Sequence, residues 1–116
     1  MSVYKIFHNP RCSKSRQALQ LLKDNNCKIE IINYLEIDLE VSLIKDILKK
    51  LVLKPRDILR KGEQEYKDNN LKKDNLSEED LINYMIKYPK LIERPIVVKG
   101  DKAVIGRPPE NVLELI

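Results

Sequence analysis

The order of predicted elements in residues 3–34 restricts the possible folds more than any other feature of this chain. Val3–Phe7 (VYKIF) and Lys28–Tyr34 (KIEIINY) are short, apolar and rich in β-prone residues, as strands are. Between them, Ser13–Asp24 carries apolar residues three and four positions apart, which predicts a helix. A strand–helix–strand unit this compact favours two parallel strands joined by a right-handed crossover. The N-terminal part of the chain is therefore predicted to have an α/β fold.

The middle of the chain is predicted to be helical. An apolar stripe over residues 41–51 indicates a helix that Asp38 would cap. Pro55 suits the first turn of a short helix, which Gly62 would end. The polar segment 63–73 is expected to lie on the surface.

A further helix is predicted to begin at Ser77, where Asp80 would complete a capping box and Pro89 would limit the C-terminal end. PIVVKGDKAVIG then predicts a β-hairpin that turns at Gly100-Asp101. A short helix over Glu110–Ile116 follows.

This order, β-α-β, then helices, then β-β-α, is that of a thioredoxin-like fold with a helical insertion between its halves. We expect a single domain, because the chain has 116 residues. Its thioredoxin-like core would comprise about 1–35 and 91–116, and the insertion about 36–90.

Composition and charge indicate which kinds of molecule this protein could bind. The net charge is only +4 and the basic residues are dispersed, which favours a small oxyanion over nucleic acid. The longest apolar runs are much shorter than the roughly 20 residues of a membrane helix, and the N-terminus lacks the plan of a signal peptide. We therefore expect a cytoplasmic protein that does not enter a membrane. Two cysteines and one histidine are too few for a zinc site, so no metal is expected.

Cys12 lies in the segment HNPRCSKS, in the loop before the first predicted helix. Unpaired N–H groups and the helix dipole favour a thiolate at that position, and cysteines so placed reach a pKa of roughly 3.5–7.5. Such a thiolate would attack a disulfide or an electrophilic oxyanion centre. The alternative is a small buried residue without a chemical role. We assign that role to Cys27, which has no basic cluster beside it.

Three neighbours are candidates to support Cys12. His8 and Arg16 would add positive potential, and Ser15 or Ser13 would either cap the helix or hydrogen-bond the thiolate. For His8, the alternative is an ordinary turn residue.

Arg60, Arg94 and Arg107 occur in DILRKG, ERP and GRPP, each at the predicted end of an element. In the expected fold, the Arg94-Pro95 junction comes near the loop that carries Cys12. Two of the three arginines precede proline, which restricts their backbone. The alternative for each is a solvated surface charge, and spacing alone does not show convergence on one anion.

Taken together, these segments resemble the ArsC family of glutaredoxin-coupled arsenate reductases over essentially the whole chain. HNPRCSKSR is similar to the family's active-site segment. ILRKGEQEY, LIERPIVV and GRPPENVLEL resemble the segments that carry its anion-binding arginines. Two departures are small: Gly62 stands where asparagine is common, and residues 67–74 are more charged than usual.

The resemblance implies that Arg60, Arg94 and Arg107 bind arsenate and that Pro95 is the cis-proline of thioredoxin-like folds. It implies further that Cys12 attacks arsenic, with His8 helping to lower its pKa. Glutathione would be the co-substrate that attacks the arsenylated cysteine, and glutaredoxin would complete the reduction to arsenite. No bound cofactor is implied.

Two other functions remain open. One is an Spx-like regulator that binds RNA polymerase, although such proteins typically switch through Cys-x-x-Cys and Ser15 replaces the second cysteine here. The other is an ArsC-like reductase of glutathione mixed disulfides, which the sequence separates poorly from an arsenate reductase. In either enzyme, Cys12 would need a resolving thiol from another molecule.

Overall fold

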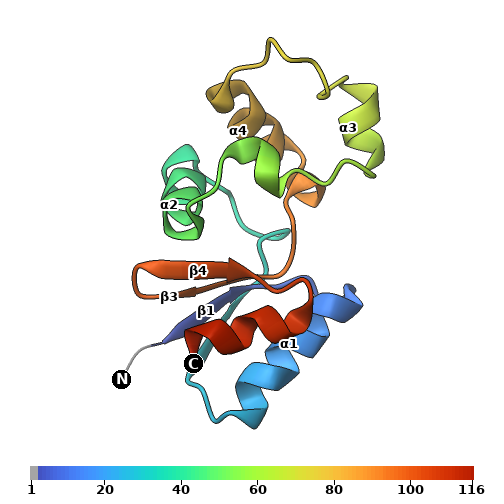
Figure 1. Cartoon of the computed structure of the whole chain (residues 1–116). Helices are drawn as coiled ribbons and strands as arrows, with labels where there is room; N and C mark the ends of the chain where they lie inside the picture. The colour runs from blue at the N-terminus through green and yellow to red at the C-terminus, as the bar shows by residue number, and fades with distance from the viewer. Residues whose placement is uncertain (1–2) are drawn as a thin grey trace. The chain divides into compact units, whose positions relative to one another are not determined.

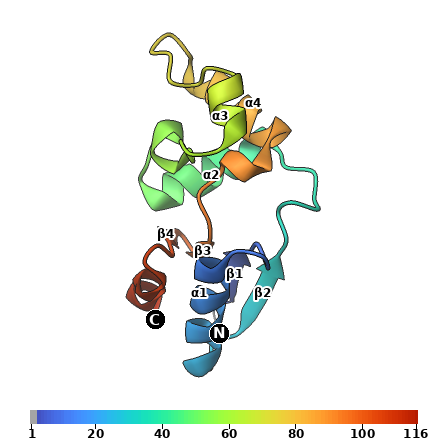
Figure 2. The ribbon, with the colours of Figure 1, turned by 90° about the vertical axis from the view of Figure 1, so that its right-hand side faces the viewer.

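The computed structural model describes residues 3–116, and the chain divides into two compact units. The first, called the sheet unit below, contains the chain up to Ile37 together with Arg94–Ile116. The second, called the helical unit, contains Asp38–Glu93. The expected boundaries were at 35/36 and 90/91. Figures 1 and 2 show the chain from two directions.

The sheet unit is built on a four-stranded mixed sheet of order β2-β1-β3-β4. Strand β1 (Tyr4–Phe7) pairs in parallel with β2 (Ile29–Ile32) and antiparallel with β3 (Ile96–Lys99). Strand β4 (Lys102–Ile105) completes a hairpin with β3, and Gly100 in its turn has φ 61°. The parallel pair and the hairpin confirm the predicted topology.

Two helices of the sheet unit pack together: α1 (Ser13–Asp24), which joins β1 to β2, and the C-terminal 3₁₀ helix η3 (Pro109–Leu115) (Figure 1). Apolar side chains from β1, β3 and both helices form one buried core: Tyr4, Ile6, Ala18, Leu22, Val97, Val112 and Leu115. The Tyr4 hydroxyl also donates a hydrogen bond of 3.1 Å to the Leu115 carbonyl oxygen. This packing fixes α1 against β1, and so fixes the loop between them.

The helical unit contains three α-helices and two 3₁₀ helices within its described residues. They are α2 (Val41–Leu51), η1 (Pro55–Ile58), α3 (Gln64–Asp68), α4 (Glu78–Lys87) and η2 (Pro89–Leu91). Helices α2 and α4 contact each other, and both turn apolar residues inward, among them Ile44, Leu48 and Met85. No helix within residues 3–116 combines the length and the apolar character that crossing a membrane requires.

Two local predictions in this unit were wrong, and the expected surface segment over 63–73 includes one short helix. The N-cap of α2 is Glu40 rather than Asp38, because the backbone enters helical geometry only at Val41. Helix η1 ends at Ile58, well before Gly62, and the polar segment after it contains the short helix α3. Polar turn-forming residues mark where a helix can end, and tertiary contacts choose among them.

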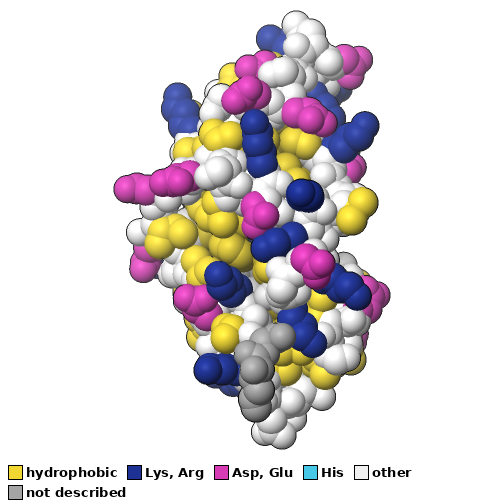
Figure 3. All heavy atoms as spheres, turned by 90° about the vertical axis from the view of Figure 1, so that its left-hand side faces the viewer, with side chains coloured by type: hydrophobic (Ala, Val, Ile, Leu, Met, Phe, Trp, Pro, Cys, Tyr) yellow, Lys and Arg dark blue, Asp and Glu magenta, His cyan; other side chains and the backbone are white. Residues whose placement is uncertain are grey.

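The surface carries mixed charge. Figure 3 shows Lys and Arg side chains interleaved with Asp and Glu side chains over one face of the molecule. The dispersal of basic residues along the sequence therefore persists in space on that face.

Helix α4 begins with the predicted capping box. The Ser77 hydroxyl accepts a 3.0 Å hydrogen bond from the Asp80 backbone N–H, and the Asp80 carboxylate accepts one of 3.0 Å from the Ser77 N–H. We expect Ser77→Ala to lower the free energy of unfolding by about 1 kcal/mol, because an N–H of the first turn loses its acceptor. Urea unfolding followed by circular dichroism measures this change.

The matched control is Ser42→Ala, an exposed serine inside α2. Alanine has the higher helix propensity, so this substitution should be neutral or slightly stabilising. Equal destabilisation by both substitutions would contradict the capping role of Ser77.

Candidate active site

Cys12 is the N-cap residue of α1, with extended backbone angles of φ −93° and ψ 121°. Its N–H donates to the Asn9 carbonyl oxygen at 3.0 Å, and its own carbonyl oxygen accepts from the Arg16 N–H at 3.0 Å. The thiol is half-buried and forms no disulfide. Of the two roles expected for Ser13 and Ser15, capping α1 is excluded, because Cys12 is the N-cap residue.

The first turn of α1 and an arginine lower the pKa of Cys12 below that of an ordinary thiol. Burial alone acts in the opposite direction and is the largest single influence, because it disfavours the charged thiolate. Hydrogen bonds to the sulfur from the Ser15 N–H, the Arg94 side chain and the Lys14 N–H together outweigh that effect, and the charge of Arg94 adds to them. The predicted thiolate position thus has a physical basis in helix amides that lack intrahelical partners.

His8 and Ser15 form a buried network behind the loop. The Ser15 hydroxyl oxygen accepts a 3.1 Å hydrogen bond from the Asn9 N–H and lies 2.6 Å from His8 Nδ1. Burial, followed by the charges of Lys23 and Arg16, lowers the pKa of His8, so the neutral ring is favoured. The Ser15 hydroxyl and His8 Nδ1 are thus paired by a hydrogen bond in the same network that holds the Asn9 N–H.

The network shows the surroundings of two residues that we expect to support Cys12. The role of His8 and Arg16 in adding positive potential at Cys12 stays a prediction. His8 contacts Ser15, whose N–H helps to lower the pKa of Cys12. Arg16 is exposed, and its side-chain charge acts on His8.

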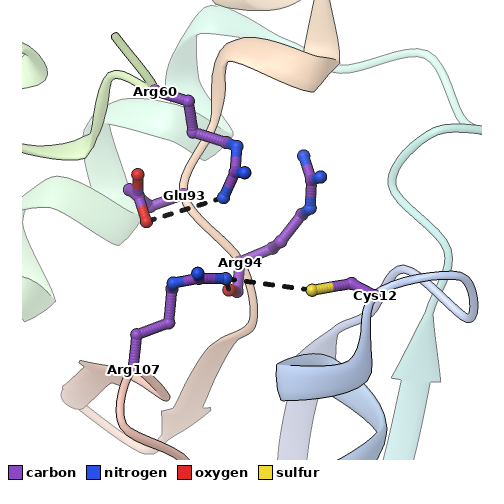
Figure 4. Close-up of polar contacts among 5 residues, drawn as sticks. All are labelled: Cys12, Arg60, Glu93, Arg94 and Arg107. Atoms are coloured by element: carbon purple, nitrogen blue, oxygen red, sulfur yellow. Dashed lines mark hydrogen bonds and ion pairs between the residues drawn. The ribbon is translucent and has the colours of Figure 1, made fainter. Parts of the chain in front are cut away.

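Arg94 and Arg107 both reach Cys12 from the ends of the β3–β4 hairpin. Arg107 Nη1 lies 3.9 Å from Cys12 Sγ and donates to the Arg94 carbonyl oxygen at 3.4 Å, as Figure 4 shows. The peptide bond that precedes Pro95 is cis, the geometry that the resemblance implies there, and the bond between Arg107 and Pro108 is also cis. Sequence analysis did not identify the second cis bond.

Gly106 holds the two arginine-bearing segments together. Its N–H donates to the Pro95 carbonyl oxygen at 2.9 Å. A Cβ atom at this position would lie 2.8 Å from Pro95 Cγ and 3.3 Å from Ala18 Cβ, too close without a shift of its neighbours. The absence of a side chain thus lets the backbone before Arg107 approach both Pro95 and α1.

Arg60 belongs to the helical unit, where its partner is Glu93. The Arg60 Nη1 atom lies 3.9 Å from Glu93 Oε2, and both side chains are mostly buried. Arg60 Nε is buried and has no hydrogen-bond partner within the described part of the chain. Sequence analysis did not single out Glu93, although it stands directly before Arg94 in ERP.

Cys27 lies beyond the opposite end of α1 from Cys12. The helix has 12 residues, and its rise of about 1.5 Å per residue separates its ends by roughly 18 Å. A disulfide requires Cα atoms within about 7 Å of each other. Cys27 therefore cannot resolve an intermediate on Cys12 while α1 is folded. Within residues 3–116, no three His, Cys, Asp or Glu side chains gather as metal ligands would.

Comparisons with known proteins identify the relatives of this chain. It is 51% identical to the uncharacterized protein YfgD of Escherichia coli K12, over 97% of this chain and 95% of that protein. It is 43% identical to an arsenate reductase of Neisseria meningitidis, over 97% of both proteins. It is 34% identical to the arsenate reductase of E. coli K12, over the whole of this chain and 82% of that protein.

The fold and the family follow from two further comparisons. The solved structure of an arsenate reductase from Vibrio cholerae is 43% identical and superposes with a TM-score of 0.96, over 99% of this chain and 98% of that one. The thioredoxin-like fold predicted from the sequence is therefore confirmed. The family model described as the ArsC family matches residues 7–115. This protein belongs to the ArsC family.

Proposed function

We propose that this protein reduces arsenate to arsenite, with Cys12 as the nucleophile. The observation that carries the proposal is the thiol itself: its pKa is lowered, and two arginines approach it from the hairpin. Relatives 34–44% identical to this chain are named arsenate reductases.

In the first step, arginines hold the oxyanion beside the sulfur. Arg94 and Arg107 lie at Cys12, and the resemblance assigns Arg60 the third position. Guanidinium groups suit this task because they donate paired hydrogen bonds to oxyanions. The Cys12 thiolate attacks arsenic, an S–As bond forms, and one As–O bond breaks as the oxygen leaves as hydroxide or water. Arsenic remains pentavalent in this adduct.

The reduction itself needs two electrons, which two thiols supply when they are joined in a disulfide. Ser15 stands three residues after Cys12, and Cys27 lies at the far end of α1, so the further thiols must come from other molecules. Glutathione is small enough to reach the adduct, and glutaredoxin would provide the next thiol. In total, one arsenate and two thiols yield one arsenite, one disulfide and one water.

A second candidate is the reduction of glutathione mixed disulfides. The site is compatible with it: Cys12 has a lowered pKa, and serine stands at position 15, where an internal resolving cysteine would lie. The same thiolate would attack a disulfide sulfur instead of arsenic, and the expelled thiolate would leave in place of hydroxide.

The first test supplies purified protein with arsenate, glutathione, glutaredoxin and a source of reducing equivalents, and measures arsenite. We expect turnover that Cys12→Ser abolishes and Cys27→Ser retains, because only Cys12 lies at the helix N-terminus. Cleavage of a glutathionylated peptide without any arsenite formation would favour the second candidate.

The pH dependence of alkylation tests the thiolate. In a Cys27→Ser background, the rate of iodoacetamide reaction should rise with pH as Cys12 loses its proton and then level off. Because the pKa of Cys12 is lowered in the folded protein, the half-maximal rate should occur at a lower pH than in the same chain unfolded in urea. Coincident profiles for folded and unfolded protein would contradict the lowered pKa.

Arg94→Ala separates anion binding from thiol activation. At a pH where Cys12 is fully ionised in both proteins, alkylation should be nearly unchanged, while kcat/KM for arsenate should fall about 10- to 100-fold, because a charge-assisted hydrogen bond contributes about 1.5–3 kcal/mol. Arg11→Ala, which removes an exposed arginine of the same loop, serves as the control. An equal loss of alkylation and arsenate use in Arg94→Ala would contradict the anion-binding role.

A further inference from the structure

Arg60 and Glu93 are held opposite each other by the backbone of the helical unit. An isolated antiparallel bridge joins Leu59 to Ile92. On its two sides, the Arg60 N–H donates to the Leu91 carbonyl oxygen at 2.7 Å, and the Glu93 N–H donates to the Ile58 carbonyl oxygen at 2.8 Å. The pair is therefore a product of the fold, not a chance meeting of two mobile surface side chains.

The distance between the two side chains is longer than that of a strong ion pair. The 3.9 Å between Arg60 Nη1 and Glu93 Oε2 exceeds the 2.7–2.9 Å of a strong charge-assisted hydrogen bond. The side chains expose only 21% and 25% of their surface, so water screens them incompletely. Figure 4 shows the Glu93 carboxylate facing the guanidinium of Arg60.

Arg60 also keeps unused donor capacity. Its Nε is buried without a hydrogen-bond partner among the residues that the structure describes. Buried donors are usually paired, so this one is available to a ligand that enters beside it. An oxyanion would offer Arg60 the short paired contacts that Glu93 does not make, and it would lie beside the negative charge of Glu93.

We propose that Glu93 tunes the affinity of the anion site: it occupies Arg60 in the free protein and competes with the incoming oxyanion. This inference rests on the proposed role of Arg60 in arsenate binding. The competition weakens the binding of doubly charged oxyanions as a class, arsenate and phosphate alike, because both are repelled by the same carboxylate. Glu93 thereby sets the affinity of the site for the anion and takes no part in the reaction of the Cys12 thiolate.

The test measures binding of arsenate and of inorganic phosphate by isothermal titration calorimetry. It uses full-length protein with Cys12→Ser, so that no covalent step contributes. Adding Glu93→Gln, which keeps the shape and removes the charge, should lower the Kd of both anions by about 3- to 10-fold. Glu40→Gln is the matched control: it changes the net charge equally at an exposed residue whose side chain makes no capping hydrogen bond.

A double-mutant cycle shows whether Glu93 acts through Arg60. If it does, the gain from Glu93→Gln should disappear once Arg60→Ala is present, an effect that a general change of charge would not produce. Unchanged or weaker binding in Glu93→Gln would overturn the competition while leaving the arsenate site intact. An absence of arsenate binding in the Cys12→Ser protein and in its Glu93→Gln variant would overturn the proposed arsenate site and the competition together.

Discussion

The placement of Cys12 as the N-cap residue of α1 is the constraint on which the proposed chemistry of this protein depends. Because Cys12 stands directly before the helix, the N–H groups of Lys14 and Ser15 lower the pKa of its thiol, against the burial that raises it. Holding α1 at the correct place is therefore the task of the apolar core, where Ala18 and Leu22 are fully buried.

The buried network behind the loop shows how a polar group can act on a nucleophile without touching it. His8 is buried, and burial lowers its pKa so that the neutral ring is favoured. The ring pairs with the Ser15 hydroxyl, which also accepts from the Asn9 N–H. The serine is thereby fixed, and its own N–H favours the thiolate of Cys12.

The sequence predicted those features that local chemistry determines. Alternation and turn residues indicated the β3–β4 hairpin, and Ser77 with Asp80 indicated the start of α4. It did not predict the lowered pKa of His8, because the burial that causes it arises only in the folded structure. Glu93 was missed for the same reason: its contact with Arg60 spans residues that only the Leu59–Ile92 bridge brings together. The resemblance to the ArsC family supplied part of what was missing. It indicated an anion-binding role for three arginines whose positions in the sequence alone did not show that they converge.

The separation of the two cysteines is the reason for proposing that an external thiol completes the reaction. A helix of 12 residues stands between Cys12 and Cys27, and Ser15 occupies the position where an internal resolving thiol would lie. A thiolate in this setting can begin a substitution at arsenic or at sulfur, and an external thiol must finish either reaction. What distinguishes the two substrates is charge: a small oxyanion can engage several guanidinium groups at once, whereas a mixed disulfide presents an uncharged sulfur. In the proposed mechanism the arginines therefore favour an oxyanion at the thiolate, and the carboxylate of Glu93 would oppose that preference at Arg60.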